Sequence, residues 1–150
     1  MAVSAARRVR ALGSLRLIPN GPVSNNRLEI RNDPLKGRGV FAGAPIAAGT
    51  LIEAAPVVVV PAAQRPLLDQ TILHDYYFSW DGDPGGPGGE GSGAVALGLV
   101  SLCNHSRRPC ARVRRNVAQG TLDLVALVPI AAGDEVTIDY NCPLWFEAQE

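Results

Sequence analysis

The sequence has no long apolar run, few cysteines and almost no lysine. No stretch approaches the roughly 18 consecutive apolar residues that a membrane-spanning helix needs, so we expect no membrane integration. The 3 cysteines, Cys103, Cys110 and Cys142, form no C-x-x-C pair. They encode neither a disulfide framework nor a four-cysteine zinc site. We therefore expect no metal and a reducing, cytoplasmic setting.

The chain also lacks net charge, because 14 basic and 14 acidic side chains cancel. A nucleic-acid-binding domain usually carries a basic surplus, so we expect no direct nucleic-acid partner. The charges are uneven, however, since residues 1–28 hold five arginines and no acid, and residues 121–150 hold six acids and no base. Such ends either attract a charged partner or are simply solvated.

Glycine and proline are plentiful, at 16 and 12 of 150 residues, and 47% of the residues are apolar. This composition favours one domain with a substantial core, built from turns and short strands rather than from long helices. We therefore predict a mainly β protein.

Four segments differ in their patterning. Residues 1–25 end in a cluster of turn formers and predict a disordered N-terminal arm. The domain is expected over residues 26–150 and ends in a short tail at 142–150. Within it, the glycine-rich residues 81–93 have too little apolar surface to offset the entropy of ordering and predict a flexible loop.

Short strands are expected where apolar and β-branched residues alternate or gather, namely at 28–32, 40–42, 71–80 and 135–140 and in a hairpin at 111–130 with its turn at 118–121. The run at residues 51–60 contains Pro56, which favours an edge or bulged strand over a central one. Residues 61–70 can form one or two helical turns, because Pro66 prevents a longer helix. Residues 94–103 are expected to be buried.

One short pattern occurs twice in the chain. PIAAGT at residues 45–50 and PIAAGD at residues 129–134 each combine Pro-Ile with a glycine turn, followed by an acidic residue, Glu53 or Glu135. We expect the same kind of turn, leading into a strand, at both places.

Three motifs stand out from a generic β domain: GRGVFA at residues 37–42, NHS at 104–106 and GDEVTIDYN at 133–141. Each alone is weak evidence, because two glycines fit any tight turn and a tyrosine in a strand is usually core packing. In this order and spacing, the chain resembles the SET domain of protein-lysine methyltransferases from about Glu29 to Asn141.

The resemblance implies a β-clip fold of short sheets with a C-terminal pseudoknot and little helix. It also implies methyl transfer from S-adenosylmethionine to the side-chain amine of a lysine in a protein or peptide. The cofactor-binding residues that it implies are Lys36, Gly37, Arg38, Gly39, Asn104, His105 and Tyr140. The catalytic residues that it implies are Tyr140, which faces the methyl-transfer axis, and Tyr76, which lines the lysine channel with Tyr77 or Phe78 behind it.

The chain departs from the family pattern at several points. Pro109-Cys110 stands where Pro-Asn is usual, and the cysteine-rich zinc segment that follows many SET domains is absent. Trp145 and Phe146 are expected either to cover the site or to pack on the barrel edge. Ile138 stands where an aromatic residue often sets how many methyl groups are added, so the sequence does not predict that number. It also leaves open the identity of the substrate and whether the chain forms a homodimer.

Three other functions are compatible with parts of the sequence. A non-catalytic β-clip module would bind a peptide or the cofactor without turnover. A cysteine hydrolase would need Cys103 and His105 as nucleophile and base, a pair that is too close in sequence to reach the required geometry easily. The five arginines of residues 107–115 could contact nucleic acid, although they equally fit a solvated face or the acidic flanks of a substrate.

Overall fold

The computed structural model describes residues 28–34, 36–81 and 91–140. The predictions for the N-terminal arm, for most of the glycine-rich loop and for the tail with Trp145 and Phe146 lie outside the described residues.

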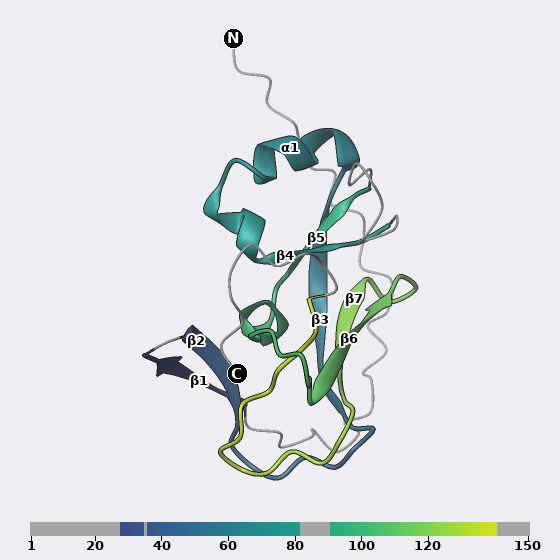
Figure 1. Cartoon of the computed structure of the whole chain (residues 1–150). Helices are drawn as coiled ribbons and strands as arrows, with labels where there is room; N and C mark the ends of the chain where they lie inside the picture. Colours follow the sequence, from purple (N-terminus) through teal and green to yellow (C-terminus); the bar gives the residue numbers. More distant parts are fainter. Residues whose placement is uncertain (1–27, 35, 82–90, 141–150) are drawn as a thin grey trace, which may run out of the picture.

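Within the described residues the chain forms two antiparallel sheets and a few short helical turns (Figure 1). The strands are β1 (Leu28–Asp33), β2 (Gly37–Ala42), β3 (Leu51–Val60), β4 (Tyr77–Ser79), β5 (Gly93–Ala96), β6 (Ala111–Asn116) and β7 (Thr121–Ala126). The helical turns are η1 (Ala62–Gln64), α1 (Arg65–Leu68), η2 (Ile72–Asp75) and η3 (Leu99–Leu102). β1 and β2 pair with each other, and the other strands form a sheet in the order β4-β5-β3-β7-β6. The mainly β prediction is confirmed.

Strand β3 is central, so the prediction of an edge strand is wrong. β7 pairs with β3 from Leu51 to Pro56, and β5 pairs with its other edge from Val57 to Val60. Each half of β3 therefore pairs with a neighbouring strand along one edge only. Pro56, which has no N–H to donate, lies where the partner changes from β7 to β5. The strand also has the predicted irregularity, but between Leu51 and Glu53 rather than at the proline.

Two other strand predictions are too long. Residues 71–80 form η2 before the three-residue strand β4, because Thr71 caps a helical turn by accepting a hydrogen bond from Leu73 N–H. Residues 135–140 form isolated bridges rather than a continuous strand. The helical turns at 61–70 and the hairpin of β6 and β7 are confirmed.

The two PIAAG segments lie side by side at the lower end of the molecule (Figure 1). Ile46 and Ile130 exchange backbone hydrogen bonds of 2.8 and 2.9 Å. Gly49 and Gly133 have positive φ angles of 80° and 90°, a conformation that glycine adopts without strain. The two segments therefore form the same kind of turn, as the repeated sequence predicts, and they pair with each other.

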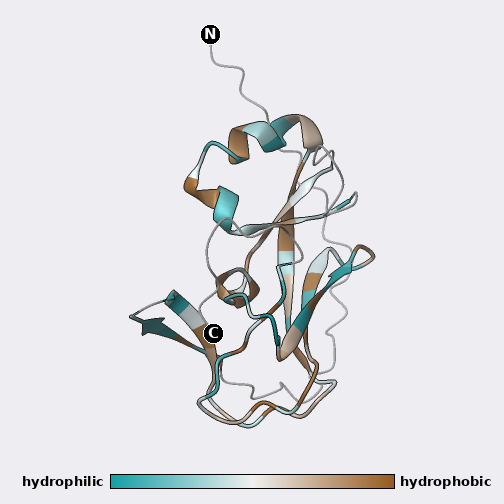
Figure 2. Cartoon of the chain, in the orientation of Figure 1, coloured by the Kyte–Doolittle hydropathy of each residue, from teal (hydrophilic) through white to brown (hydrophobic). Residues whose placement is uncertain are grey.

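The core gathers apolar side chains from both sheets and from the segments between them. Its largest fully buried members are Leu122, Leu124, Ile138, Val40, Val100, Val136 and Cys103. Figure 2 shows β1 as a mostly hydrophilic strand and β3 as mostly hydrophobic. GRGVFA contributes Val40 and Ala42 to this core, and GDEVTIDYN contributes Val136 and Ile138, so burial of apolar surface holds these two motifs against one another. No described helix has the length and apolar character to span a membrane.

Candidate active site

The last described segment, residues 133–140, is held by backbone bonds from two sides. Val136 N–H donates to Val40 O of β2 at 2.7 Å. Ile138 N–H donates to Asn104 O and Ser106 N–H donates to Ile138 O, each at 3.0 Å. The motifs GRGVFA, NHS and GDEVTIDYN, far apart in sequence, therefore meet at one place.

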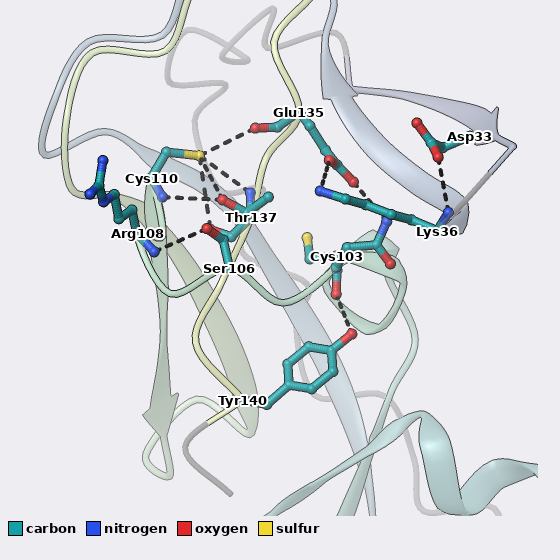
Figure 3. Close-up of polar contacts among 10 residues, drawn as sticks. Asp33, Lys36, Cys103, Ser106, Arg108, Cys110, Glu135, Thr137 and Tyr140 are labelled. Atoms are coloured by element: carbon teal, nitrogen blue, oxygen red, sulfur yellow. Dashed lines mark hydrogen bonds and ion pairs between the residues drawn. The ribbon is translucent and has the colours of Figure 1, made fainter. Parts of the chain in front are cut away.

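Cys110 and Thr137 join the same segment to the start of β6 (Figure 3). The Cys110 sulfur accepts from Thr137 N–H at 3.3 Å and its thiol donates to Glu135 O at 3.4 Å. Ala111 N–H donates to Thr137 O at 3.0 Å. The cysteine that departs from the family pattern thus makes polar contacts of its own, and Thr137 is buried among them.

Glu135 connects the NHS and GRG motifs through its carboxylate. Asn104 Nδ2 donates to Glu135 Oε1 at 2.7 Å, and Lys36 Nζ lies 3.5 Å from Glu135 Oε2. Both charged side chains are mostly buried, at 20% exposure for Lys36 and 17% for Glu135. Glu135 is not among the site residues predicted from the sequence, although it lies in the GDEVTIDYN motif and follows the second PIAAG turn.

The two positions of the GRG motif that hold glycine require it for different structural reasons. Gly37 has a φ of 76°, which disfavours other residues. A Cβ on Gly39 would lie 2.6 Å from Glu135 Oε1 and 2.9 Å from Asn104 Nδ2. Asn104 and Glu135 therefore require a residue without a side chain at position 39. Arg38, between the glycines, is exposed on β2.

His105 and Tyr140 contact each other. Their ring centroids are 5.3 Å apart, and Tyr140 N–H donates to His105 Nδ1 at 3.2 Å. Nδ1 is the acceptor in this hydrogen bond. Asp139 Oδ1 lies 3.7 Å from the same Nδ1. The Tyr140 hydroxyl donates to Cys103 O at 3.0 Å, so the residue is held at its backbone and at its hydroxyl.

Glu53 is a second residue that was not predicted to belong to the site. Its two carboxylate oxygens accept from Leu99 N–H at 2.9 Å and Val100 N–H at 2.8 Å, the first N–H groups of η3. No side chain of the preceding Gly98 can cap this turn, and a Cβ there would lie 2.7 Å from Glu53 Oε1. Glu53 therefore ties β3 to the turn that leads into the NHS motif.

Tyr76 and Tyr77 have different surroundings. Tyr76 ends η2, is partly buried, and donates its backbone N–H to Leu73 O. The Tyr77 hydroxyl donates to Asp69 at 2.6 Å and accepts from Arg65 Nε at 2.8 Å. Burial, with the Asp69 hydrogen bond, raises the pKa of Tyr77 above its ordinary value. Phe78 packs against the core.

Cys103 is a poor candidate for a nucleophile. Its side chain is 2% exposed, and burial strongly raises the pKa of the thiol, with Glu53 adding to the effect. Because the thiolate is the reactive form, a thiol held protonated is inert at neutral pH. The structure therefore gives no support to a cysteine hydrolase built on Cys103 and His105.

Comparison with protein families matches residues 37–141 to the SET domain. A histone-lysine N-methyltransferase of Schizosaccharomyces pombe, specific for H3 lysine-37, is 36% identical over 127 residues, which are 84% of this chain and 81% of that protein. A Plasmodium falciparum structure assigned to the histone methyltransferases has 26% identity and a TM-score of 0.59, and the match covers 77% of this chain and 97% of that one.

KRYPTONITE, solved in complex with mCHG DNA and SAH, has 22% identity and a TM-score of 0.59, and the match covers 80% of this chain and 24% of that one. At this identity the likeness concerns the fold alone. The β-clip fold expected from the sequence is confirmed. The chain belongs to the SET-domain family, and it is a lysine methyltransferase.

Proposed function

We propose that the chain transfers the methyl group of S-adenosylmethionine to a protein lysine, at a site formed where GRGVFA, NHS and residues 133–140 meet. The observation that carries the proposal is the set of contacts that joins Lys36, Asn104, His105 and Tyr140 to a common segment. The SET family generally uses this donor, which supports the same choice for this chain.

The residues present fit the cofactor. Its amino-acid end carries both an ammonium and a carboxylate, and Lys36 and Glu135 offer a partly exposed charge of each sign. Asn104 supplies an amide beside them. We infer that these side chains and the backbone of Gly37, Arg38 and Gly39 hold the cofactor, and that His105 holds its adenine portion or its amino-acid end.

The reaction requires a neutral lysine amine, yet free lysine has a pKa of about 10.4 and is mostly protonated at pH 7. When bound, S-adenosylmethionine supplies an electrophilic methyl group on a positive sulfur. We propose that Tyr140 and Tyr76 exclude water from the incoming side chain and so disfavour its charged form. The Tyr140 hydroxyl donates its proton to Cys103 O, and a hydroxyl oxygen is of the type that accepts weak C–H hydrogen bonds from a polarised methyl group. Its role is therefore positioning at the reacting centre, without a strong base.

The substrate class follows from the relative of known specificity. Because the Schizosaccharomyces pombe enzyme acts on lysine 37 of histone H3, we propose a lysine in a histone or in a similarly basic protein segment. The cytoplasmic location, the homodimer and the absence of a nucleic-acid partner stay predictions from the sequence.

Replacing Tyr140 with phenylalanine tests the proposed role. The Tyr140→Phe variant removes only the hydroxyl, so we expect kcat to fall about tenfold or more while the affinity for S-adenosylmethionine changes little. The measurement is transfer of a labelled methyl group to a histone H3 peptide containing lysine 37, with the peptide mass confirming the product. Tyr77→Phe is the matched control, because its hydroxyl is occupied by Arg65 and Asp69.

Unchanged turnover in Tyr140→Phe would contradict the role of the hydroxyl. Wild-type protein that binds the cofactor but methylates neither this peptide nor whole histones would contradict the proposed substrate class.

A further inference from the structure

Residues 133–140 bond to the rest of the molecule on two sides. The N–H groups of Val136 and Ile138 donate to β2 and to the NHS motif, and both side chains are buried in the core. The C=O of Glu135 and the N–H of Thr137 bond instead to the side chain of Cys110, just before β6 (Figure 3). One side of the segment therefore depends on a single cysteine.

The sulfur of Cys110 both accepts and donates. It accepts from Thr137 N–H at 3.3 Å, and its thiol donates to Glu135 O at 3.4 Å. Among the residues that the structure describes, no other acceptor contacts this N–H. Thr137 is 9% exposed, so water reaches it poorly. Without the sulfur, this N–H would be left buried and unpaired, which costs free energy.

The same sulfur fixes the backbone of Glu135. The carboxylate of Glu135 accepts from Asn104 Nδ2 at 2.7 Å, while its C=O accepts from the Cys110 thiol. There is little free space around the carboxylate, because a Cβ on Gly39 would lie 2.6 Å from it. Hydrogen bonds weaken steeply when their geometry is lost. A small shift of the Glu135 backbone would therefore weaken the contact with Asn104.

Tyr140 belongs to the same segment but is held by other residues. Its N–H donates to His105 Nδ1, and its hydroxyl donates to Cys103 O. Neither of these contacts involves Cys110. A change at Cys110 should therefore displace Glu135 more than Tyr140.

From these contacts we propose that Cys110 is a positioning residue, whose sulfur bridges Thr137 N–H and Glu135 O and so holds Glu135 beside Asn104. The inference rests on the proposed function, because its effect is measured through the cofactor. Asparagine, the usual residue of the family pattern here, carries an oxygen that accepts and an amide that donates. The thiol can make the same two kinds of bond, although it is the weaker donor and acceptor.

The Cys110→Ala variant tests the bridge, because it removes both the donor and the acceptor. We expect the Kd and the KM for S-adenosylmethionine to rise about threefold to tenfold. The kcat at saturating cofactor should change less than about twofold, because Tyr140 keeps its own contacts. Binding is measured by calorimetric titration of the full chain, and turnover by transfer of a labelled methyl group to the histone H3 peptide.

Three further variants separate the bridge from simple packing. Cys110→Asn and Cys110→Ser each restore a donor and an acceptor, so at least one should bind the cofactor within about twofold of wild type. Val113→Ala is the matched packing control, because Val113 is a partly buried residue of β6 that packs on the core. It should lower the thermal stability and leave the affinity for the cofactor unchanged.

Hydrogen exchange at the Thr137 amide, read by NMR without any ligand, tests the sulfur contact itself. Exchange should be faster in Cys110→Ala than in wild type, and slow again in the variant that restores binding.

Unchanged exchange and unchanged cofactor affinity in Cys110→Ala would overturn the proposal. A lower kcat with an unchanged KM, or asparagine and serine variants that are both as weak as alanine, would show a structural role only and would overturn it as well. Wild-type protein that binds no S-adenosylmethionine would overturn the proposed function instead, and exchange at Thr137 would still decide whether the sulfur holds the segment.

Discussion

At the scale of single residues, several polar side chains of this molecule bind backbone or other side chains rather than solvent. Glu53, Glu135 and Asp123 are acidic, and each accepts at least two hydrogen bonds or ion pairs in the folded chain. Their charges therefore contribute to structure, since a buried carboxylate is tolerated only when it is well partnered.

Asp123 gives a pH-dependent prediction. Burial by itself raises the pKa of Asp123, but hydrogen bonds from Thr121, Arg114 and Asn116 outweigh it and hold this pKa below its ordinary value. A folded-state pKa below the unfolded value stabilises the protein above the unfolded pKa of about 3.9, and this stability is lost as pH falls through the folded pKa. We expect Asp123→Asn to lower the free energy of unfolding by about 1–3 kcal/mol at pH 7.

The measurement is denaturant unfolding of wild type and variant at several values from pH 7 down to about pH 3. The difference should shrink toward the acid end. Glu29→Gln, at an exposed pair, is the control and should change stability little. A difference that is constant over this range would contradict the account.

At the scale of elements, η3 connects the sheet to the site. It consists of only four residues, Leu99–Leu102, and the NHS motif begins two residues after it ends. Val100 is fully buried and anchors the turn in the core. The direction in which the chain enters the NHS motif is therefore set by η3 and by Glu53, which binds its first N–H groups.

Glu53→Gln tests this connection. Glutamine keeps one carbonyl oxygen and replaces the other with an amide that cannot accept, so one of the two N–H groups loses its partner. We expect faster hydrogen exchange at Leu99 or Val100 and weaker cofactor binding, by about threefold to tenfold. Exchange is read by NMR at the individual amides, with Leu122 in β7 as an internal reference. Unchanged exchange at both η3 amides would show that Glu53 is not needed there.

Sequence patterns predicted most elements but not their limits. The alternation of residues 28–32 and the hairpin of residues 111–130 were recognisable because their partners are adjacent in sequence. The central position of β3 was not, because the change of partner at Pro56 depends on β5 and β7, which follow later in the chain. The short η2 in place of a strand depends on the local cap at Thr71.

The site residues divide in the same way, into those that lie in recognisable motifs and those whose contacts depend on the complete fold. Gly39, Asn104, His105 and Tyr140 belong to motifs that the sequence displays, and Lys36 directly precedes the first of these motifs. The structure brings them together at one segment. Glu53 and Glu135 both follow a PIAAG turn, and Glu135 lies in the GDEVTIDYN motif, but neither was predicted to be a site residue. Their contacts join residues 31 to 47 positions apart, and no local pattern reports such contacts.

At the scale of the whole molecule, the last described segment closes the fold and the site together. Residues 133–140 pair with β2 through Val136, with the NHS motif through Ile138 and with β6 through Thr137. The same paired PIAAG turns that begin β3 also lead into this segment. Formation of the site therefore requires nearly the complete fold, so cofactor binding should stabilise the chain as a unit.

The most direct measurement is calorimetric titration of the full chain with S-adenosylmethionine, in parallel with Asn104→Ala. We predict saturable binding by wild type at about one equivalent, weakened about tenfold or more in the variant, because Asn104 joins Glu135 to the NHS motif. Absence of saturable binding by wild type, or equal affinity in Asn104→Ala, would contradict the conclusion that the three motifs form one cofactor site.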